Sequence, residues 1–81
     1  MSAATDSSTR KTTEIYVRLL NEGTEVCRPT QALDLGNGLY EVLPTADYDP
    51  EDETWEFPPG SVVRCEKKRD QSGDYLRAVK A

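Results

Sequence analysis

The chain has 81 residues, of which 36% are hydrophobic, and a formal net charge of −5. A chain of this length buries only about 60% of the surface that its unfolded form exposes, so it has room for one small core. No apolar run approaches the roughly 20 residues of a membrane span, and the polar N-terminal residues lack the apolar segment of a secretion signal. We therefore expect a cytoplasmic protein that makes no membrane contact.

The charge is distributed unevenly along the chain. Residues 1–24 contain three acidic and three basic residues, residues 25–60 contain nine acidic residues against one arginine, and residues 61–81 contain three acidic and six basic residues. This pattern predicts one acidic side and one mildly basic side. Overall acidity argues against non-specific nucleic-acid binding, in which neutralised phosphates supply most of the affinity, and suits a basic protein partner.

The chain begins with a segment of small and polar residues. Residues 1–11, MSAATDSSTRK, show no hydrophobic periodicity and cannot bury enough apolar area to offset the entropy lost on ordering. We expect them to form a disordered tail, followed by a single β-barrel domain over residues 12–81.

The first two predicted elements are strands. Residues 13–20 alternate, with Ile15, Val17 and Leu19 on one side, which is the period of a β-strand. Asn and Gly in the segment 21–24 predict a tight turn before a second strand over 25–35. Because Pro29 cannot donate a backbone hydrogen bond, this strand should be interrupted, bulged or at a sheet edge there.

Turn signals divide the rest of the chain into short segments. Gly-Asn-Gly at 36–38 predicts a hairpin between the second strand and the third. The predicted later strands cover residues 39–44, 54–57, 61–69 and 75–80. Six or so short strands without a helical stripe predict an all-β fold, a small and strongly bent antiparallel barrel of the SH3-like or OB-like type.

The same alternation predicts the residues of the core. The apolar residues expected to supply most of it are Ile15, Val17, Leu19, Val26, Tyr40, Val42, Trp55, Phe57, Val63 and Leu76. The register of each strand decides this set, because a slip of one residue turns every side chain to the opposite face.

Two segments resemble an uncharacterised family of small, mostly bacterial proteins. LLNEGTEVCRP at 19–29 is similar to its opening pattern LL-x-EGT-x-V-x-RP, and WEFPPGSVVRCE at 55–66 is similar to its closing pattern WEF-x-PG-x-x-V-R-x-E. The resemblance implies no activity, cofactor or partner. Members tend to have an aromatic residue in place of Cys27, which favours a packing role at that position. Residues 22–42 also resemble strands of Tudor-like and other SH3-like barrels.

An acidic segment precedes the only tryptophan and the only phenylalanine of the chain. Its six carboxylates, the candidate partner-binding residues, are Asp47, Asp49, Glu51, Asp52, Glu53 and Glu56. The spacing of an EF-hand fails, because Asp52 and Pro58 stand where its Gly and bidentate Glu are required. A looser calcium or magnesium site stays an alternative, but we expect the acids to lie in water at a loop tip, where they keep the neighbouring strand from pairing with other chains.

Trp55 and Phe57 lie on the same side of a predicted strand, so we expect them to close one end of the barrel core. In the alternative, an exposed Trp55 beside carboxylates would bind a cationic peptide or a methylated side chain.

A second candidate surface combines arginine and tyrosine residues of the predicted strands. Its members are Arg18, Arg28, Arg64, Arg77, Tyr16, Tyr40 and Tyr75. Aromatic rings interleaved with arginines hold single-stranded nucleic acids on OB-type surfaces. The competing interpretation is that these arginines are the polar half of the strand alternation and pair with glutamates across the sheet.

No pattern in the chain indicates catalysis. Histidine is absent, and neither Cys27 nor Cys65 has a basic residue at a spacing that would activate it. We expect two buried, reduced thiols, no catalytic residue, no metal and no cofactor. The sequence favours a non-enzymatic domain that docks a protein partner, including the inhibitor or immunity type, over a binder of single-stranded nucleic acid.

Overall fold

Six β-strands follow one another along the chain in the computed structural model, which describes residues 11–81. They are β1 (Thr12–Leu20), β2 (Val26–Gly36), β3 (Leu39–Val42), β4 (Thr54–Trp55), β5 (Val62–Asp70) and β6 (Gly73–Lys80). The predicted all-β class with about six short strands is confirmed. Residues 1–10 of the expected disordered tail lie outside the described residues. Residues 11–81 contain no helix that is long and apolar enough to cross a membrane.

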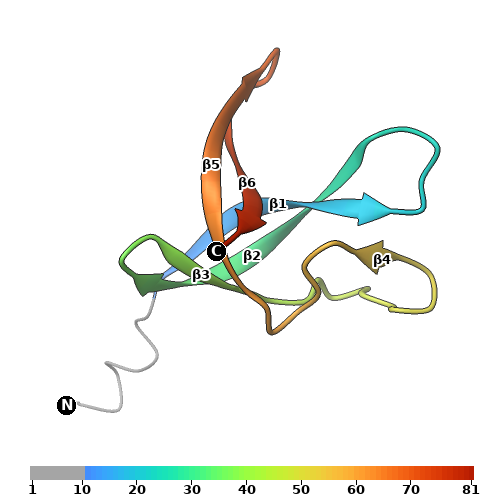
Figure 1. Ribbon diagram of the computed structural model, residues 1–81, viewed down its shortest axis with the longest axis horizontal. Helices are drawn as coiled ribbons and strands as arrows, with labels where there is room; N and C mark the ends of the chain where they lie inside the picture. Colours follow the sequence, from blue (N-terminus) through green and yellow to red (C-terminus); the bar gives the residue numbers. More distant parts are fainter. Residues whose placement is uncertain (1–10) are drawn as a thin grey trace.

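Five of the strands form a ring. The order of neighbours around the ring is β2, β3, β5, β6 and β1, and β1 closes the ring by pairing with β2 (Figure 1). The short strand β4 pairs with the edge of β1 that faces away from β2. Neighbours are antiparallel except β1 and β6, which are parallel and pair at Tyr16 and Arg77. The parallel pair follows from the connectivity. Direction reverses at each antiparallel step from β1 through β2, β3 and β5 to β6, so β6, the fifth strand of the ring, has the same direction as β1. The predicted bent barrel is confirmed, and its specific likeness to SH3-like barrels stays a prediction.

The turn between β2 and β3 has the geometry that its glycines predict. Gly36, Asn37 and Gly38 all have positive φ, at 89°, 59° and 78°, and the pairing shifts between Asp34 and Gly36. Residues other than glycine and asparagine rarely adopt this conformation. The predicted β2–β3 hairpin is therefore confirmed.

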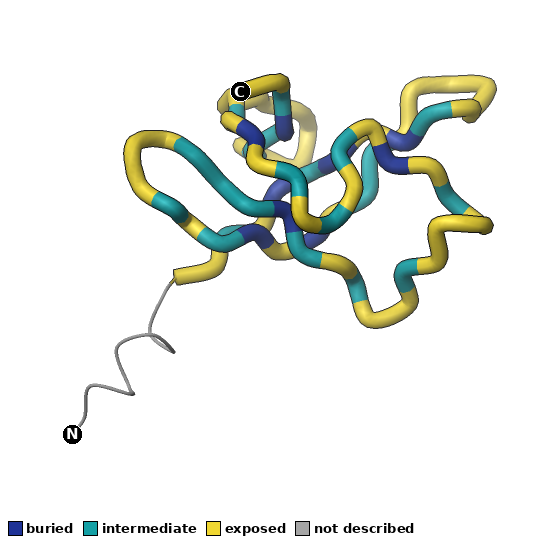
Figure 2. Tube along the Cα trace, turned by 60° about the horizontal axis from the view of Figure 1, so that its bottom comes forward, coloured by how far each residue is buried: buried dark blue, intermediate teal, exposed yellow. Residues whose placement is uncertain are grey.

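The core lies where the strands cross, and the turns and hairpin ends are exposed (Figure 2). Its buried members are Ile15, Val17, Leu19, Ala32, Val42, Trp55, Val63 and Ala78, with Tyr40, Tyr48, Phe57, Cys65 and Leu76 half-buried against them. The alternation of β1 thus places the expected side chains inside. The prediction that Trp55 and Phe57 pack on the core is confirmed.

Two features of the core differ from the predicted set. Val26 was expected inside but is 37% exposed, because it lies at the far end of β2, opposite Leu19, on the part of the β1–β2 hairpin that extends beyond the ring. Ala32 and Ala78 are buried although they were not expected, and they lie opposite Val42 and Cys65 on the neighbouring strands. Thr30 is buried too, and its hydroxyl donates to the Leu43 carbonyl at 2.6 Å.

Pro29 lies within a continuous β2 strand rather than at a break. β1 pairs with β2 from Val26 to Leu33, and β3 pairs with it only from Ala32 onward. Pro29 is therefore at a position where β2 has a strand neighbour on one side only, which is one of the three predicted solutions.

Two adjacent valines of β5 test the inward face. Val63 is fully buried and Val62 is 48% exposed. We expect Val63→Ala to lower the free energy of unfolding by about 2 kcal/mol, through lost apolar burial and a residual cavity. Val62→Ala should change it by less than about 0.5 kcal/mol. Urea unfolding of the two variants measures the difference, and equal losses would contradict the assigned register.

Candidate functional site

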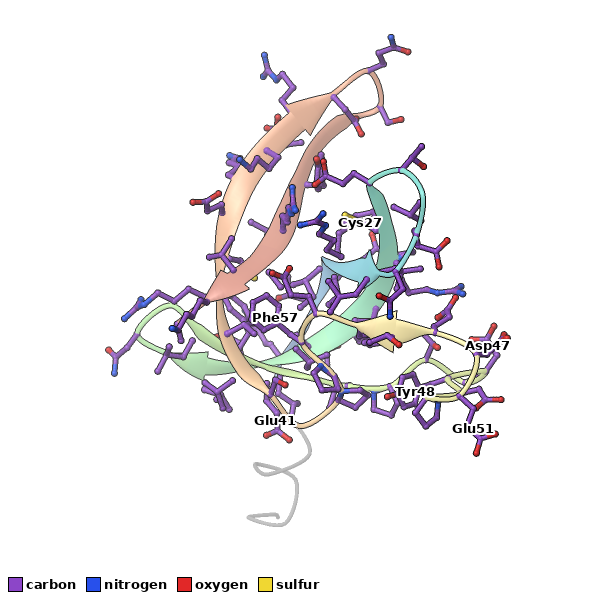
Figure 3. All side chains as sticks on the ribbon, turned by 45° about the vertical axis from the view of Figure 1, so that its right-hand side comes forward. Cys27, Glu41, Asp47, Tyr48, Glu51 and Phe57 are labelled. Carbon is purple, nitrogen blue, oxygen red and sulfur yellow. The ribbon has the colours of Figure 1, made fainter. Side chains whose placement is uncertain are left out.

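The acidic segment forms a loop between β3 and β4. Asp47, Asp49, Glu51 and Asp52 are exposed on this loop, and Glu56 is exposed directly after β4. In Figure 3, Asp47 and Glu51 project from one side of the barrel, with Tyr48 beside them. We call the five residues Asp47, Asp49, Glu51, Asp52 and Glu56 the acidic rim.

Backbone hydrogen bonds give the loop a defined turn. The Asp49 carboxylate accepts from the Glu51 N–H at 2.9 Å. The Asp49 carbonyl accepts from the N–H groups of Asp52 and Glu53, both at 3.0 Å. The first bond is that of an Asx turn, in which a short acidic side chain fixes the backbone that follows it, and the other two close a backbone turn.

Glu53 was predicted among the solvated acids and is instead an anchor of the loop. Its carboxylate accepts hydrogen bonds from both the Nε and Nη2 groups of Arg28 and, at 3.1 Å, from Trp55 Nε1. The bond from Arg28 lowers the pKa of Glu53, the bond from Trp55 lowers it further, and Glu53 in turn raises the pKa of Arg28. Its side chain is only 18% exposed, so Glu53 has little surface to offer a partner.

The alternative of an exposed Trp55 is wrong. Trp55 is 3% exposed, and its ring packs edge-on against Tyr48 with ring centroids 4.8 Å apart. It pairs with Leu19 of β1, which fixes β4 to the barrel. Trp55 therefore connects the acidic loop to the core and presents no ring face for a cationic ligand.

The looser metal site finds no support in the geometry. Among residues 11–81, no three side chains of His, Cys, Asp or Glu approach closely enough to hold a metal ion. The five carboxylates of the acidic rim are exposed and make no ion pair among the described residues.

A second feature is an open cleft of about 490 Å³ between the β1–β2 hairpin and the β5–β6 hairpin. We call it the hairpin cleft; it is lined by Tyr16, Glu25, Cys27, Asp70, Ser72, Gly73, Asp74, Tyr75 and Arg77. The Tyr16 and Tyr75 rings meet edge to face, with centroids 5.1 Å apart and planes at 71°. Figure 3 shows Cys27 between the two hairpins, away from Asp47 and Glu51.

Carboxylates outnumber cations in this cleft. Its lining contains Glu25, Asp70 and Asp74 against Arg77 alone. Arg77 Nη1 lies 2.6 Å from Glu25 Oε2, so the only lining cation is already paired. Asp74 is paired in turn with Lys67 and Arg69, so Asp70 is the one lining carboxylate without an ion pair among the described residues. The lining therefore offers a phosphate backbone no free cation.

The other members of the predicted arginine and tyrosine surface are dispersed. Arg28 is bound to Glu53, and Arg64 Nη1 donates to the Asn37 carbonyl at 3.3 Å. Tyr40 packs on the core, and Arg18 is exposed on β1. The structure brings together only Tyr16, Tyr75 and Arg77 of the seven predicted residues.

The two cysteines are free and half-buried rather than fully buried as expected. Burial raises the pKa of the Cys65 thiol, which makes it a poorer nucleophile. Cys27 lines the hairpin cleft and is reached from solvent there.

Sequence reasoning missed the acidic lining of the hairpin cleft. Glu25, Asp70 and Asp74 stand at the ends of two different hairpins, and only the parallel β1–β6 pair brings these ends together. The available signal was that the β1–β2 turn and the β5–β6 turn each have an acidic residue next to a strand that contains a tyrosine. Nothing local indicated that the first and last strands meet.

The comparisons with known proteins add no relative, since the chain matches no protein-family model, no curated protein and no solved structure.

The loop anchor predicts a specific pH dependence. Because Glu53 has a lower pKa in the folded chain than in the unfolded one, it stabilises the fold above its ordinary pKa of about 4.3. This stabilisation is lost as the pH falls through the lowered pKa of the folded state. We expect Glu53→Gln to cost roughly 1–2 kcal/mol at neutral pH, as for a charge-assisted hydrogen bond, and progressively less below the ordinary pKa.

Glu51→Gln is the matched control for this prediction, because Glu51 is exposed on the same loop and makes no ion pair within residues 11–81. Urea unfolding at several pH values measures both variants. A stability difference between parent and Glu53→Gln that is independent of pH would contradict the assigned role of the carboxylate.

Proposed function

We propose that this protein is a non-enzymatic, cytoplasmic interaction domain whose acidic rim docks a basic protein partner. The observation that carries the proposal is that the five rim carboxylates are exposed and, within residues 11–81, make no ion pair. Such a surface steers a positively charged partner toward the loop and raises the rate of association.

The rim is also held in place before any partner arrives. Glu53 and Trp55 fix the end of the loop to Arg28 and to β1, and Asp49 orders the turn within it. A preorganised surface loses less conformational entropy on binding than a mobile one does. This anchoring distinguishes the rim from acids that serve only solubility.

Two further features support the cytoplasmic and non-enzymatic parts of the proposal. Cys27 and Cys65 are free thiols, which are usual in a reducing compartment. The chain has no histidine, the commonest general base. An inhibitor or immunity protein of a basic partner is one form that such a domain could take.

Binding of single-stranded nucleic acid has less support. Tyr16, Tyr75 and Arg77 do meet, as the alternative requires, but Arg77 is paired with Glu25 and two more carboxylates line the same cleft. A phosphate backbone placed there would meet no unpaired cation of the lining. We therefore favour the protein partner.

Neutralising four rim residues tests the proposal. The variant with Asp49→Asn, Glu51→Gln, Asp52→Asn and Glu56→Gln leaves Glu53 in place, so we expect its melting temperature to stay within a few degrees of the parent. Association with a basic partner should slow, and its dependence on salt should flatten. Immobilised parent and variant are compared by quantitative capture from the native cell, followed by rate measurements on each captured protein.

The matched control neutralises four acids elsewhere, with Glu14→Gln, Glu22→Gln, Asp34→Asn and Glu66→Gln. It changes the net charge equally but keeps the rim, so it should retain the partners that the rim variant loses. Partners that bind the parent, the rim variant and the control variant equally would overturn the proposal. A single-stranded oligonucleotide that binds the parent, and binds the rim variant more tightly, would favour the alternative function.

A further inference from the structure

The hairpin cleft has an unpaired strand edge as one wall. β6 pairs with β5 from Gly73 to Lys80, but it pairs with β1 only at Arg77. Between Gly73 and Tyr75, β6 therefore has no second strand neighbour within residues 11–81. These residues line the cleft consecutively, together with Ser72, so the edge of the strand faces the cleft as well as its side chains.

The outer edge of β5, on the opposite side of the β5–β6 hairpin, is protected against pairing with another strand, whereas the free edge of β6 is not. β5 pairs with β3 only at Val62 and Val63, so within the described part of the chain its outer edge has no strand neighbour from residue 64 to 70. That part of β5 carries Arg64, Lys67, Lys68 and Arg69, and such charges prevent edge-to-edge association. The free edge of β6 carries neither lysine, arginine nor proline, and is recessed in the cleft.

The other walls of the cleft define the side chain that would fit. Asp70 accepts a bond from the Ser72 N–H at 2.7 Å and makes no ion pair among the described residues. Tyr16 and Tyr75 supply aromatic rings, which attract cations through their faces. The unpaired Asp70 carboxylate and the tyrosine rings together match a lysine or arginine side chain.

The cleft also has a suitable size. Its volume of about 490 Å³ lies within the usual range of ligand pockets, and it is open along the strand edge. An extended segment binds such an edge through backbone hydrogen bonds, while pockets for alternate side chains give specificity.

We propose that the hairpin cleft binds an extended segment of a partner protein, which pairs with the free edge of β6 and places a lysine or arginine side chain against the tyrosine rings and carboxylates of the cleft. This site goes beyond the acidic rim. It does not depend on the rim being a docking surface, because it is formed by other elements.

Arg77 has a defined part in this site. Its guanidinium, 23% exposed, is bound to Glu25, as Lys67 and Arg69 are bound to Asp74, so Asp70 is the one cleft carboxylate without an ion pair among the described residues. An incoming cation competes with Arg77 for Glu25. Replacing Arg77 by glutamine should therefore raise the affinity for a cationic segment, whereas a nucleic-acid site would lose affinity from the same change.

Capped heptapeptides in which Thr alternates with Arg, with Gln or with Glu are the probes. They are titrated into the ¹⁵N-labelled full chain, and amide chemical shifts and amide exchange are recorded. We expect the Arg peptide to shift amides around Cys27 and Tyr75. It should slow exchange at Asp74, the residue between Gly73 and Tyr75 whose N–H points away from β5 in the antiparallel pairing. The Gln peptide should bind more weakly and the Glu peptide not measurably.

Two hairpin aspartates give a matched pair of variants. Asp34 accepts from the Gly36 N–H at 2.9 Å as Asp70 does from Ser72, and asparagine preserves both bonds. Asp70→Asn should lower the affinity for the Arg peptide about fivefold, and Asp34→Asn should leave it unchanged. The two cysteines add an internal control, because bound peptide should slow alkylation of Cys27 but not of Cys65.

The proposal is overturned if the Arg peptide does not bind at millimolar concentration, if its shifts fall only on residues 47–56, or if both aspartate variants lose affinity equally. Preference for the Glu peptide, or a fall in affinity on Arg77→Gln with the fold intact, overturns it as well. The rim variant should keep the cleft shifts, so failure here and failure of the rim proposal are distinguished.

Discussion

The barrel depends on β1, the strand with which three others pair. β2 lies along its whole length, β6 meets it at Tyr16, and β4 meets it at Leu19 and Leu20. The inward side chains of β1, at alternate positions, form the centre of the core, while Tyr16 faces the cleft outside. A slip of one residue would expose the inward set, so the hydrophobic alternation of this strand fixes both the packing of the ring and the position of the cleft.

Arg28, the one base within residues 25–60, fixes the acidic loop to the barrel. Arg28 binds Glu53 through two nitrogens, and Trp55 donates to the same carboxylate. Taking a carboxylate out of water is unfavourable unless its oxygens are satisfied, and these three groups satisfy one another. The remaining acids of the loop have no such partner among the described residues and stay at the surface. One half-buried ion pair thereby gives the acidic loop a fixed place on the barrel.

Local patterns predicted the elements well, because alternation and turn residues act over a few positions. The Gly36–Gly38 turn and the inward face of β1 follow from them directly. What could not be predicted depends on contacts between distant segments. Glu53 looked like its solvated neighbours because its partner, Arg28, is 25 residues away. The hairpin cleft was missed for the same reason, since it exists only where the first strand meets the last. Val26 was wrongly assigned to the core because no local signal shows where the ring ends and the β1–β2 hairpin projects.

The length of the β5–β6 hairpin exceeds what the core requires. Val63 and Ala78 are buried near its base, whereas every residue from 66 to 74 is exposed. A two-stranded ribbon is only marginally stable by itself, and the exposed cross-strand pairs of Asp74 with Lys67 and Arg69 contribute little in water. Shortening this hairpin would remove two unpaired edges without loss of buried apolar area. Stability alone therefore does not account for the projecting part, which forms one wall of the cleft and holds the free edge of β6 opposite Tyr16.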